Sequence, residues 1–349
     1  MTMEDDRMTD AAMTDTRTYE CPNFVLQCGI TLPAAKLVYK TYGTLAEDKS
    51  NVILYPTSYS AQHSDIEWLI GADRILDPSR YFIIIPNMMT NGLSTSPSNT
   101  PYPLNQGRFP AITIYDNVML QRRFLTEVFG IERLAMVYGW SMGGQQAYHW
   151  GALFPDAVDR LLITCSSART SEHNKIFLDS IRAALTADPA WRDGWFQEQP
   201  VKGIRAMGRI YAGWAISQTF YRQQLYKSLG YATLEDFLVR FWEWTYARRD
   251  ANDLYAQLGT WFNSDISANE LYRGDLAKAL GAIKAKVLLM PGETDLYFRP
   301  EDNELEMPHL KNAELRPIPS IWGHRAGNPS QNPEDERFIA QGVRDLLSA

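Results

Sequence analysis

A serine held between two glycines is the group in this sequence best suited to covalent chemistry. Residues 139–143 fit the pattern G-x-S-x-G with Ser141 at its centre, between the apolar run Leu134–Tyr138 and a helical pattern. A sharp turn from strand to helix strains the serine and exposes its hydroxyl, and a Cβ at Gly139 or Gly143 would crowd that turn. The motif and its context predict that Ser141 is a nucleophile.

A serine hydroxyl is a weak nucleophile and needs a basic side chain beside it. Among the five histidines, His324 lies in a loop between the last strand-like run and the C-terminal helix, where such a base is expected after Ser141. His149 lies on the helix after the serine and is expected to be structural. His173 and His309 are expected at the surface. His324 is therefore the predicted base.

The base needs a carboxylate that orients its ring. Asp295 follows the apolar run Lys286–Met290, so it should lie at the carboxyl end of a buried strand, and Glu293 is the alternative. The resulting chain order of serine, acid and histidine is the one that accompanies G-x-S-x-G motifs. The predicted catalytic residues are Ser141, Asp295 and His324.

The oxyanion formed during acyl transfer needs backbone N–H donors. The N–H of Met142, at the start of the helix after the serine, is one candidate. A second should come from the loop after Val52–Tyr55, where Thr57 or Ser58 can donate and Pro56 cannot.

These groups require a framework of buried strands and intervening helices. Short apolar runs are typical of strands buried on both faces, and helical patterns such as Ile114–Phe129 separate them. The runs are Val52–Tyr55, Tyr81–Pro86, Leu134–Tyr138, Arg160–Thr164, Lys286–Met290 and Glu314–Ile318, with an alternating strand at Lys36–Thr41. This order predicts an α/β fold with βαβ crossovers and a mostly parallel central sheet.

Three parts of the chain differ in composition and in predicted secondary structure. Residues 1–18 are polar and mostly acidic, which predicts a disordered leader. Residues 170–280 are helical and aromatic, without buried strands, and are interpreted as a cap inserted into the core. The core itself is expected to comprise residues 19–169 and 281–349.

Composition narrows the class of protein. The net charge of −7 argues against nucleic acid as a partner, and no run of residues is long and apolar enough to span a membrane. The cysteines, Cys21, Cys28 and Cys165, are few and lack metal-ligand spacing, which favours a reduced cytoplasmic setting without a bound metal. Cys165 lies at the end of an apolar run and is expected to be buried.

The sequence resembles the homoserine O-acetyltransferase family of α/β-hydrolases. The segments that carry the resemblance are Asp77–Asn87, Gly92–Pro110, Gly139–Gly144, Asp188–Gly194 and Arg248–Ile266. The resemblance implies the α/β-hydrolase fold, the same order of catalytic residues and a homodimer formed through the cap. It also implies an acyl-enzyme exchanged with a second substrate that enters between cap and core.

The sequence departs from that family at the expected acceptor site. Family members carry an aspartate after the catalytic histidine that is taken to hold the amino group of homoserine, whereas this chain has Arg325. An arginine that the family cap uses for the homoserine carboxylate aligns near Gly208, although Arg205 and Arg209 lie close by. The family's His-Ala is Tyr55-Pro56 here. Side chains expected to contact substrate are Trp140, Tyr59, Arg325 and Trp214.

The leading hypothesis is a serine hydrolase that cleaves a small ester or amide through an acyl-enzyme. The alternative is an O-acyltransferase of the homoserine O-acetyltransferase type with acyl-CoA as co-substrate. A third hypothesis is a non-catalytic ligand-binding protein, against which the filled catalytic positions argue. No metal or organic cofactor is expected in any of these cases.

Overall fold

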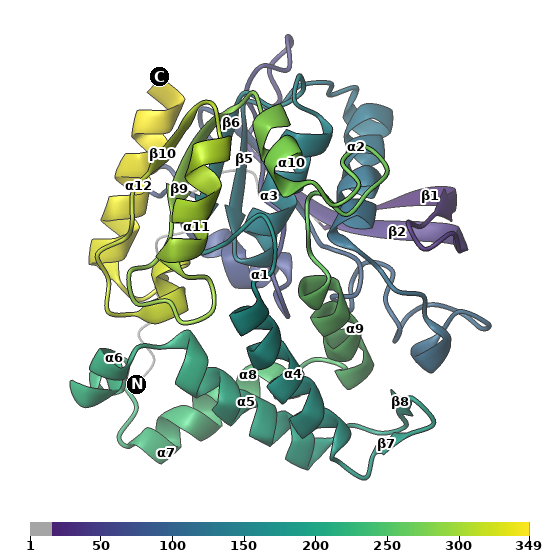
Figure 1. Ribbon diagram of the computed structural model, residues 1–349, viewed down its shortest axis with the longest axis vertical. Coiled ribbons are helices and arrows are strands. Elements are labelled where there is room, and N and C mark those ends of the chain that lie inside the picture. Colours follow the sequence, from purple (N-terminus) through teal and green to yellow (C-terminus); the bar gives the residue numbers. More distant parts are fainter. Residues whose placement is uncertain (1–15, 349) are drawn as a thin grey trace.

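The protein is built around one large sheet. The computed structural model describes residues 16–348. Eight strands form the sheet in the order β1-β2-β4-β3-β5-β6-β9-β10 (Figure 1). They are β1 (Arg17–Val25), β2 (Thr31–Tyr42), β3 (Val52–Leu54), β4 (Phe82–Pro86), β5 (Met136–Trp140), β6 (Arg160–Thr164), β9 (Lys286–Met290) and β10 (Ala313–Leu315). The β1–β2 and β2–β4 pairs are antiparallel and all other pairs are parallel, so the prediction of a mostly parallel sheet is confirmed.

Helices surround this sheet and form a layer at one end of it. Those of the core are α1 (His63–Ile66), α2 (Ile114–Phe129), α3 (Met142–Leu153), α10 (Leu276–Ala282), α11 (Pro300–Glu306) and α12 (Pro333–Ser348). Those of the inserted layer are α4 (Glu172–Thr186), α5 (Val201–Ala215), α6 (Gln218–Arg222), α7 (Leu234–Phe237), α8 (Trp244–Ala247) and α9 (Ala251–Phe262). We call α4 to α9, with the two-strand hairpin of β7 (Trp191–Arg192) and β8 (Trp195–Phe196), the cap.

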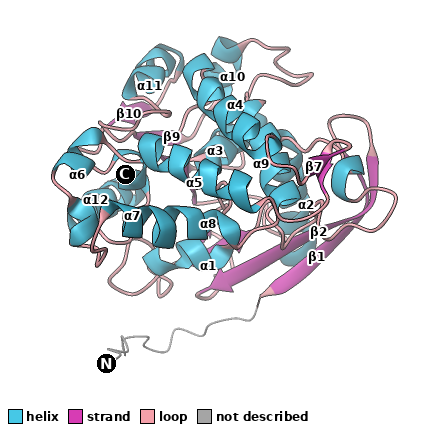
Figure 2. Ribbon diagram, turned by 90° about the horizontal axis from the view of Figure 1, so that it is seen from below, coloured by secondary structure: helices cyan, strands magenta, loops and turns pink. Residues whose placement is uncertain are grey.

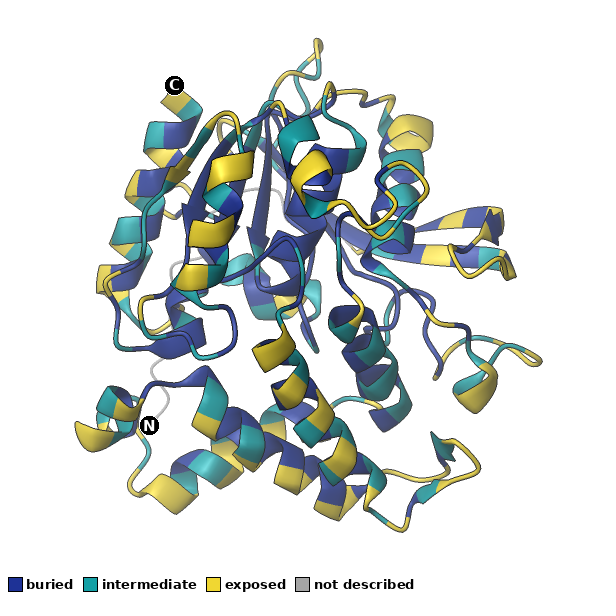
Figure 3. Ribbon diagram, in the orientation of Figure 1, coloured by how far each residue is buried: buried dark blue, intermediate teal, exposed yellow. Residues whose placement is uncertain are grey.

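The central strands are apolar along their whole length because both faces of the sheet are covered. In β3, Ile53 joins the cluster of buried side chains that includes α12, whereas Val52 and Leu54 join the cluster that includes α2 and α3. Figure 3 shows these strands as buried, while the β1–β2 hairpin alternates between buried and exposed residues. The short apolar runs were therefore a sound basis for the α/β prediction.

The element boundaries agree closely with the predictions in the core and less well at the chain ends. The predicted helix Ile114–Phe129 and strand Arg160–Thr164 have the predicted bounds. The predicted leader lies largely outside the described residues, but Arg17 and Thr18 already belong to β1. The last strand ends at Leu315 rather than Ile318, although the N–H groups of Arg316 and Ile318 still donate to Leu289 O (2.8 Å) and Pro291 O (2.7 Å).

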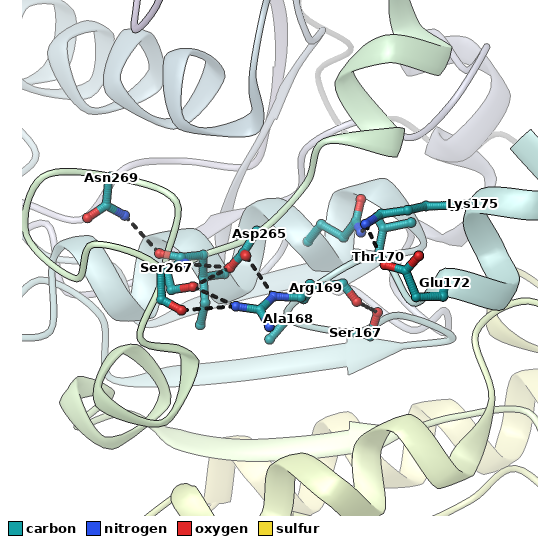
Figure 4. A network of polar contacts seen from close by, with 12 residues as sticks. Ser167, Ala168, Arg169, Thr170, Glu172, Lys175, Asp265, Ser267 and Asn269 are labelled. Carbon is teal, nitrogen blue, oxygen red and sulfur yellow. Dashed lines mark hydrogen bonds and ion pairs between the residues drawn. The ribbon is translucent and has the colours of Figure 1, made fainter. Parts of the chain in front are cut away.

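The cap is joined to the core through a short antiparallel contact between its two connecting segments. The Thr170 N–H donates to Ser264 O (2.9 Å), and the Ile266 N–H donates to Ala168 O (3.1 Å). Figure 4 shows Arg169 at the centre of this junction: its Nε lies 2.6 Å from Asp265 Oδ2. Helix α10, which the predicted cap included, follows this junction and contacts α3 of the core.

The cap lies across the carboxyl end of the parallel strands (Figures 1 and 2). Helix α7 continues into α8 through a π-helical stretch, Leu238–Glu243, which packs against α5. Such stretches are rare and often accompany functional sites. Here the π-helical stretch places aromatic and basic side chains opposite the end of β5, where Ser141 follows.

Candidate active site

Ser141 occupies a strained turn between β5 and α3. Its backbone has φ 57° and ψ −127°, a conformation that a residue with a side chain rarely adopts. The Ser141 N–H donates to Thr164 O (3.1 Å), and Ser166 Oγ donates to Ser141 O (2.7 Å), so the neighbouring strand holds the turn in place. The side chain is almost fully buried in the protein, at 3% exposure.

Two glycines permit this turn, as the motif predicted. A Cβ on Gly139 would lie 2.4 Å from Gly143 O, and one on Gly143 would lie 2.7 Å from Pro56 O. Both distances are far below van der Waals contact, so a side chain at either position would force the elbow or the adjoining loop to move.

His324 and Asp295 lie together as predicted. His324 Nδ1 lies 2.6 Å from Asp295 Oδ2, and Asp295 Oδ1 accepts hydrogen bonds from the N–H groups of Tyr297 and Phe298, each at 3.1 Å. The Tyr297 ring centroid is 4.4 Å from that of His324, so the imidazole is packed as well as hydrogen bonded. The alternative acid, Glu293, is exposed and points to no partner within the described residues.

The loop after β3 lies against the elbow through several hydrogen bonds. Ser58 Oγ donates to Trp140 O and accepts from the Gly143 N–H (3.3 Å). The Thr57 N–H donates to Pro86 O at 3.3 Å, whereas within residues 16–348 the N–H groups of Ser58 and Met142 make no hydrogen bond. The loop is therefore placed where an oxyanion would be bound beside Ser141.

A cavity of about 320 Å³ opens above this site, between the cap and the core. Ser141 and His324 both line it, which brings the predicted nucleophile and base to one space, and the Ser141 hydroxyl makes no hydrogen bond in the described chain. Aromatic side chains from the cap make up much of the wall. They are Tyr211, Tyr231, Phe241, Trp242, Trp244, Tyr246 and Trp261.

Three of the four predicted substrate contacts line this cavity. They are Tyr59, Trp140 and Arg325. Trp214 does not line it, contrary to the prediction: its ring packs against Phe177 and His173, with centroids 5.1 Å away in both cases. Aromatic composition identified the cap but could not say which face of α5 each ring occupies.

The remaining histidines take the places expected of them. His173 and His309 are exposed. His149 is buried in α3 with its Nδ1 2.8 Å from Gln145 O, and burial lowers the pKa of His149 to about 4. A histidine that stays neutral and packed in a helix is structural.

Cys165 lies beside the histidine and the acid, and side-chain ligand atoms of Cys165, Asp295 and His324 lie within 4.8 Å of one another. These residue types can bind a metal ion. Cys165 is buried, as expected, and burial raises the pKa of its thiol well above the usual value.

Several supporting interactions were not predicted from the sequence, although Ser58 and Trp140 were singled out there for other roles. Ser166 and Ser58 hold the elbow, and Gln146 Nε2 donates to Thr57 O at 2.8 Å. Trp140 Nε1 donates to His324 O at 3.3 Å. No short motif predicts these interactions, because each joins a side chain to a backbone atom that is distant in the sequence.

Known proteins share this architecture. The model of the alpha/beta hydrolase fold matches residues 61–324. An ethyl acetate hydrolase of Pseudomonas veronii is 39% identical over 302 residues, 86% of each chain. The structure of the acetyl esterase MekB has a TM-score of 0.92 at 35% identity, covering 96% of this chain and 97% of that one. A homoserine O-acetyltransferase of Zymomonas mobilis is 33% identical, over 82% of this chain and 84% of its own.

The chain therefore belongs to the α/β-hydrolase fold family, and it is an enzyme of that family. The expected resemblance to homoserine O-acetyltransferases is confirmed, although the relative named as an ethyl acetate hydrolase is more similar. Within residues 16–348, no helix is both long and apolar enough to cross a membrane.

Proposed function

We propose that this protein is a serine esterase that hydrolyses small esters through an acyl-enzyme on Ser141. The observation that carries the proposal is the 2.6 Å contact between His324 Nδ1 and Asp295 Oδ2, beside a cavity that His324 and the strained Ser141 both line. The relatives named as an ethyl acetate hydrolase and an acetyl esterase support an ester as the substrate.

The reaction follows from the arrangement of the side chains. His324 Nε2 takes the proton of Ser141 Oγ as the oxygen attacks the ester carbonyl, and Asp295 holds the ring and stabilises the imidazolium. The tetrahedral intermediate collapses, the alcohol leaves with the proton from His324, and the acyl group remains on Ser141. Water, activated by the same histidine, then attacks the acyl carbonyl and releases the carboxylic acid and the free serine.

The oxyanion of each intermediate needs donors that are free beforehand. The Met142 N–H, at the N-terminus of α3, is the first donor. The second is the Ser58 N–H, since the Thr57 N–H already donates to Pro86 O. Gln146 and the Ser58 side chain hold this loop against the elbow. Donors fixed in this way need little reorganisation during the reaction.

Water is the acceptor because the cap offers no free arginine for homoserine at the position the transferases use. A Cβ on Gly208 would lie 2.9 Å from Trp242 O, so no larger residue fits there. Arg205 and Arg209 are both ion-paired with Glu243, each at 2.7 Å. Acyl transfer to homoserine is the second candidate, favoured by the identity to the Zymomonas mobilis transferase.

Hydrolysis of p-nitrophenyl acetate, with and without homoserine, tests this function. The wild type should release acetate at a rate that homoserine does not change, and Ser141→Ala should lower kcat by a factor of about 10⁴ or more. The exposed Ser228→Ala serves as the matched control and should resemble the wild type. Formation of O-acetylhomoserine would support the transferase instead, and full activity in Ser141→Ala would refute the nucleophile.

Three further properties stay predictions of the sequence: the cytoplasmic setting, the homodimer through the cap and the absence of a cofactor. We also propose that the cap ends at the junction near residue 264, since the chain returns there to the segment from which it left.

A further inference from the structure

Three arginines line the cavity above Ser141, and their partners differ. Arg248 Nη2 lies 2.7 Å from Asp65 Oδ1, and Arg240 Nη1 lies 3.3 Å from Asp236 Oδ1. Arg325 alone of the three has no carboxylate within ion-pair distance in the described chain. Within residues 16–348, its guanidinium makes one hydrogen bond, a long one from Nη2 to the Ser330 hydroxyl at 3.4 Å.

The surroundings of Arg325 do not offset its charge. The side chain is partly buried, and burial lowers the pKa of Arg325, although a guanidinium stays protonated in proteins. The titratable groups that act on it most are the hydroxyls of Tyr231, Tyr246 and Tyr297. Burial raises the pKa of Tyr246 and Tyr297 well above 10, so these two hydroxyls are neutral at physiological pH.

Arg325 makes one favourable contact with an aromatic ring, but this contact is too weak to explain why a guanidinium lies in the cavity wall. The guanidinium carbon of Arg325 lies 4.8 Å from the centroid of the Phe241 ring, a cation–π distance. Such contacts contribute about 0.5–2 kcal/mol and provide no hydrogen-bond acceptor for the N–H groups of the guanidinium. A guanidinium kept in this place with most of its N–H groups unused is poised for an anion that arrives from the cavity.

We propose that Arg325 binds a carboxylate carried by the substrate, so that the preferred ester is an anionic one. This inference rests on the proposed esterase function and names its substrate class. The carboxylate lies either in the alcohol part, as in acetyl esters of hydroxy acids, or in the acyl part, as in half-esters of dicarboxylic acids. The fork of a guanidinium suits both, because it pairs with a carboxylate through two parallel hydrogen bonds.

The position of Arg325 in the chain links this subsite to the chemistry. Arg325 follows the base directly in the sequence, in a short helical turn that spans Gly323–Gly327. A substrate anchored there is held relative to the same segment that carries His324. Binding energy at a distance from the reacting bond then serves to orient the ester carbonyl.

The test uses pairs of esters that have similar shape and differ in charge. Acetoxyacetate is compared with isobutyl acetate, and monoethyl succinate with ethyl isocaproate, so that the two pairs distinguish the alcohol and acyl positions. The wild type should favour the anionic member of at least one pair by kcat/KM. Arg325→Gln should lower that anionic-to-neutral ratio by about ten- to a hundredfold, since a hydrogen bond to a charged group is lost.

Two variants control for charge and for packing. Arg222→Gln removes one positive charge from an exposed position in α6 and should leave the ratio at its wild-type value. Arg325→Lys keeps the charge without the fork and should retain part of the preference. An equal loss for both members of a pair in Arg325→Gln, or no anionic preference in the wild type, would overturn the proposal.

A binding measurement separates this proposal from the esterase function. Calorimetric titration of Ser141→Ala with the preferred anionic ester should show binding that the additional Arg325→Gln change weakens about ten- to a hundredfold. If p-nitrophenyl acetate is hydrolysed but this binding is absent, the esterase function stands and the anion subsite fails. If Ser141→Ala binds the anionic ester but the wild type hydrolyses no ester, the anion subsite stands and the esterase function fails.

Discussion

Asp295 illustrates how far a single side chain determines the chemistry proposed here. Its two oxygens are divided between functions: Oδ2 meets His324 Nδ1, and Oδ1 is fixed by the Tyr297 and Phe298 N–H groups. Because both backbone donors follow Asp295 within three residues, the carboxylate cannot rotate without losing them. The ring of His324 is therefore held in one orientation and one tautomer.

Replacing this carboxylate should be costly while leaving the fold intact. Asp295→Asn should lower kcat by a factor of about 10³–10⁴, because an amide cannot stabilise the imidazolium and can favour the wrong tautomer. Circular dichroism should match that of the wild type.

The exposed Glu293 provides the matched control for this change. Glu293→Gln should keep kcat within a factor of about two, because its side chain contacts none of the proposed catalytic residues. The reverse pattern, with Glu293→Gln inactive and Asp295→Asn active, would reassign the acid.

Some functional side chains could be read from the sequence and others could not. Ser141, His324 and Asp295 stand at ends of elements that have strong local patterns, so their meeting was predictable. The lack of a carboxylate partner for Arg325 could not be predicted, because it depends on which carboxylates the folded chain brings near that side chain. Trp214 was misplaced for the same reason: an aromatic residue in a helix does not reveal which neighbour it faces.

At the scale of elements, the elbow between β5 and α3 depends on space for its backbone. Gly143→Ala would place a Cβ 2.7 Å from Pro56 O and 3.3 Å from Ser58 Oγ, so the loop that supplies the second oxyanion donor must shift. We expect kcat for p-nitrophenyl acetate to fall by about tenfold or more, since loss of one such donor costs a factor of about 10²–10³.

A glycine with free space around it is the control for that experiment. Gly213 lies in α5, and a Cβ there would meet nothing within 4 Å. Gly213→Ala should keep the activity and stabilise the helix by about 0.5–1 kcal/mol, measured as a higher midpoint in urea. Loss of activity in Gly213→Ala, with none in Gly143→Ala, would contradict the account of the elbow.

The elements themselves were predictable where the pattern is local. Helix α2 begins at a capping box formed by Thr113 and Asp116 and ends at Gly130 with φ 60°, which the sequence signals directly. The π-helical stretch Leu238–Glu243 carries no such signal. It packs against α5 and carries part of the cavity wall, so the sequence did not predict how that wall is built.

At the scale of the whole molecule, a buried acid couples stability to pH. Glu306 accepts hydrogen bonds from Tyr148, Asn303 and the Ala168 N–H, and burial raises the pKa of Glu306 from 4.5 to about 7. The folded protein therefore holds this proton more tightly than the unfolded chain does. The stabilisation is complete below about pH 4.5 and is lost as the pH rises to about 7.

Glu306 should contribute a decline of about 2–3 kcal/mol in the free energy of unfolding as the pH rises from about 4.5 to about 7. Glu306→Gln, which cannot ionise, should flatten the decline when unfolding in urea is measured from pH 5 to pH 8. The exposed Glu304→Gln on the same helix should keep the wild-type slope. An unchanged slope in Glu306→Gln would show that other groups control the pH dependence.

The central claim of the account is an acyl group carried by Ser141, and trapping that intermediate tests it most directly. Wild-type protein mixed with p-nitrophenyl acetate and quenched in acid within milliseconds can be digested and analysed by mass spectrometry. We predict an acetyl group on Ser141 that decays as acetate is released, and no acetyl group on that peptide in Ser141→Ala. Acetate release without any acetylated serine, or acetylation confined to another residue, would contradict the account.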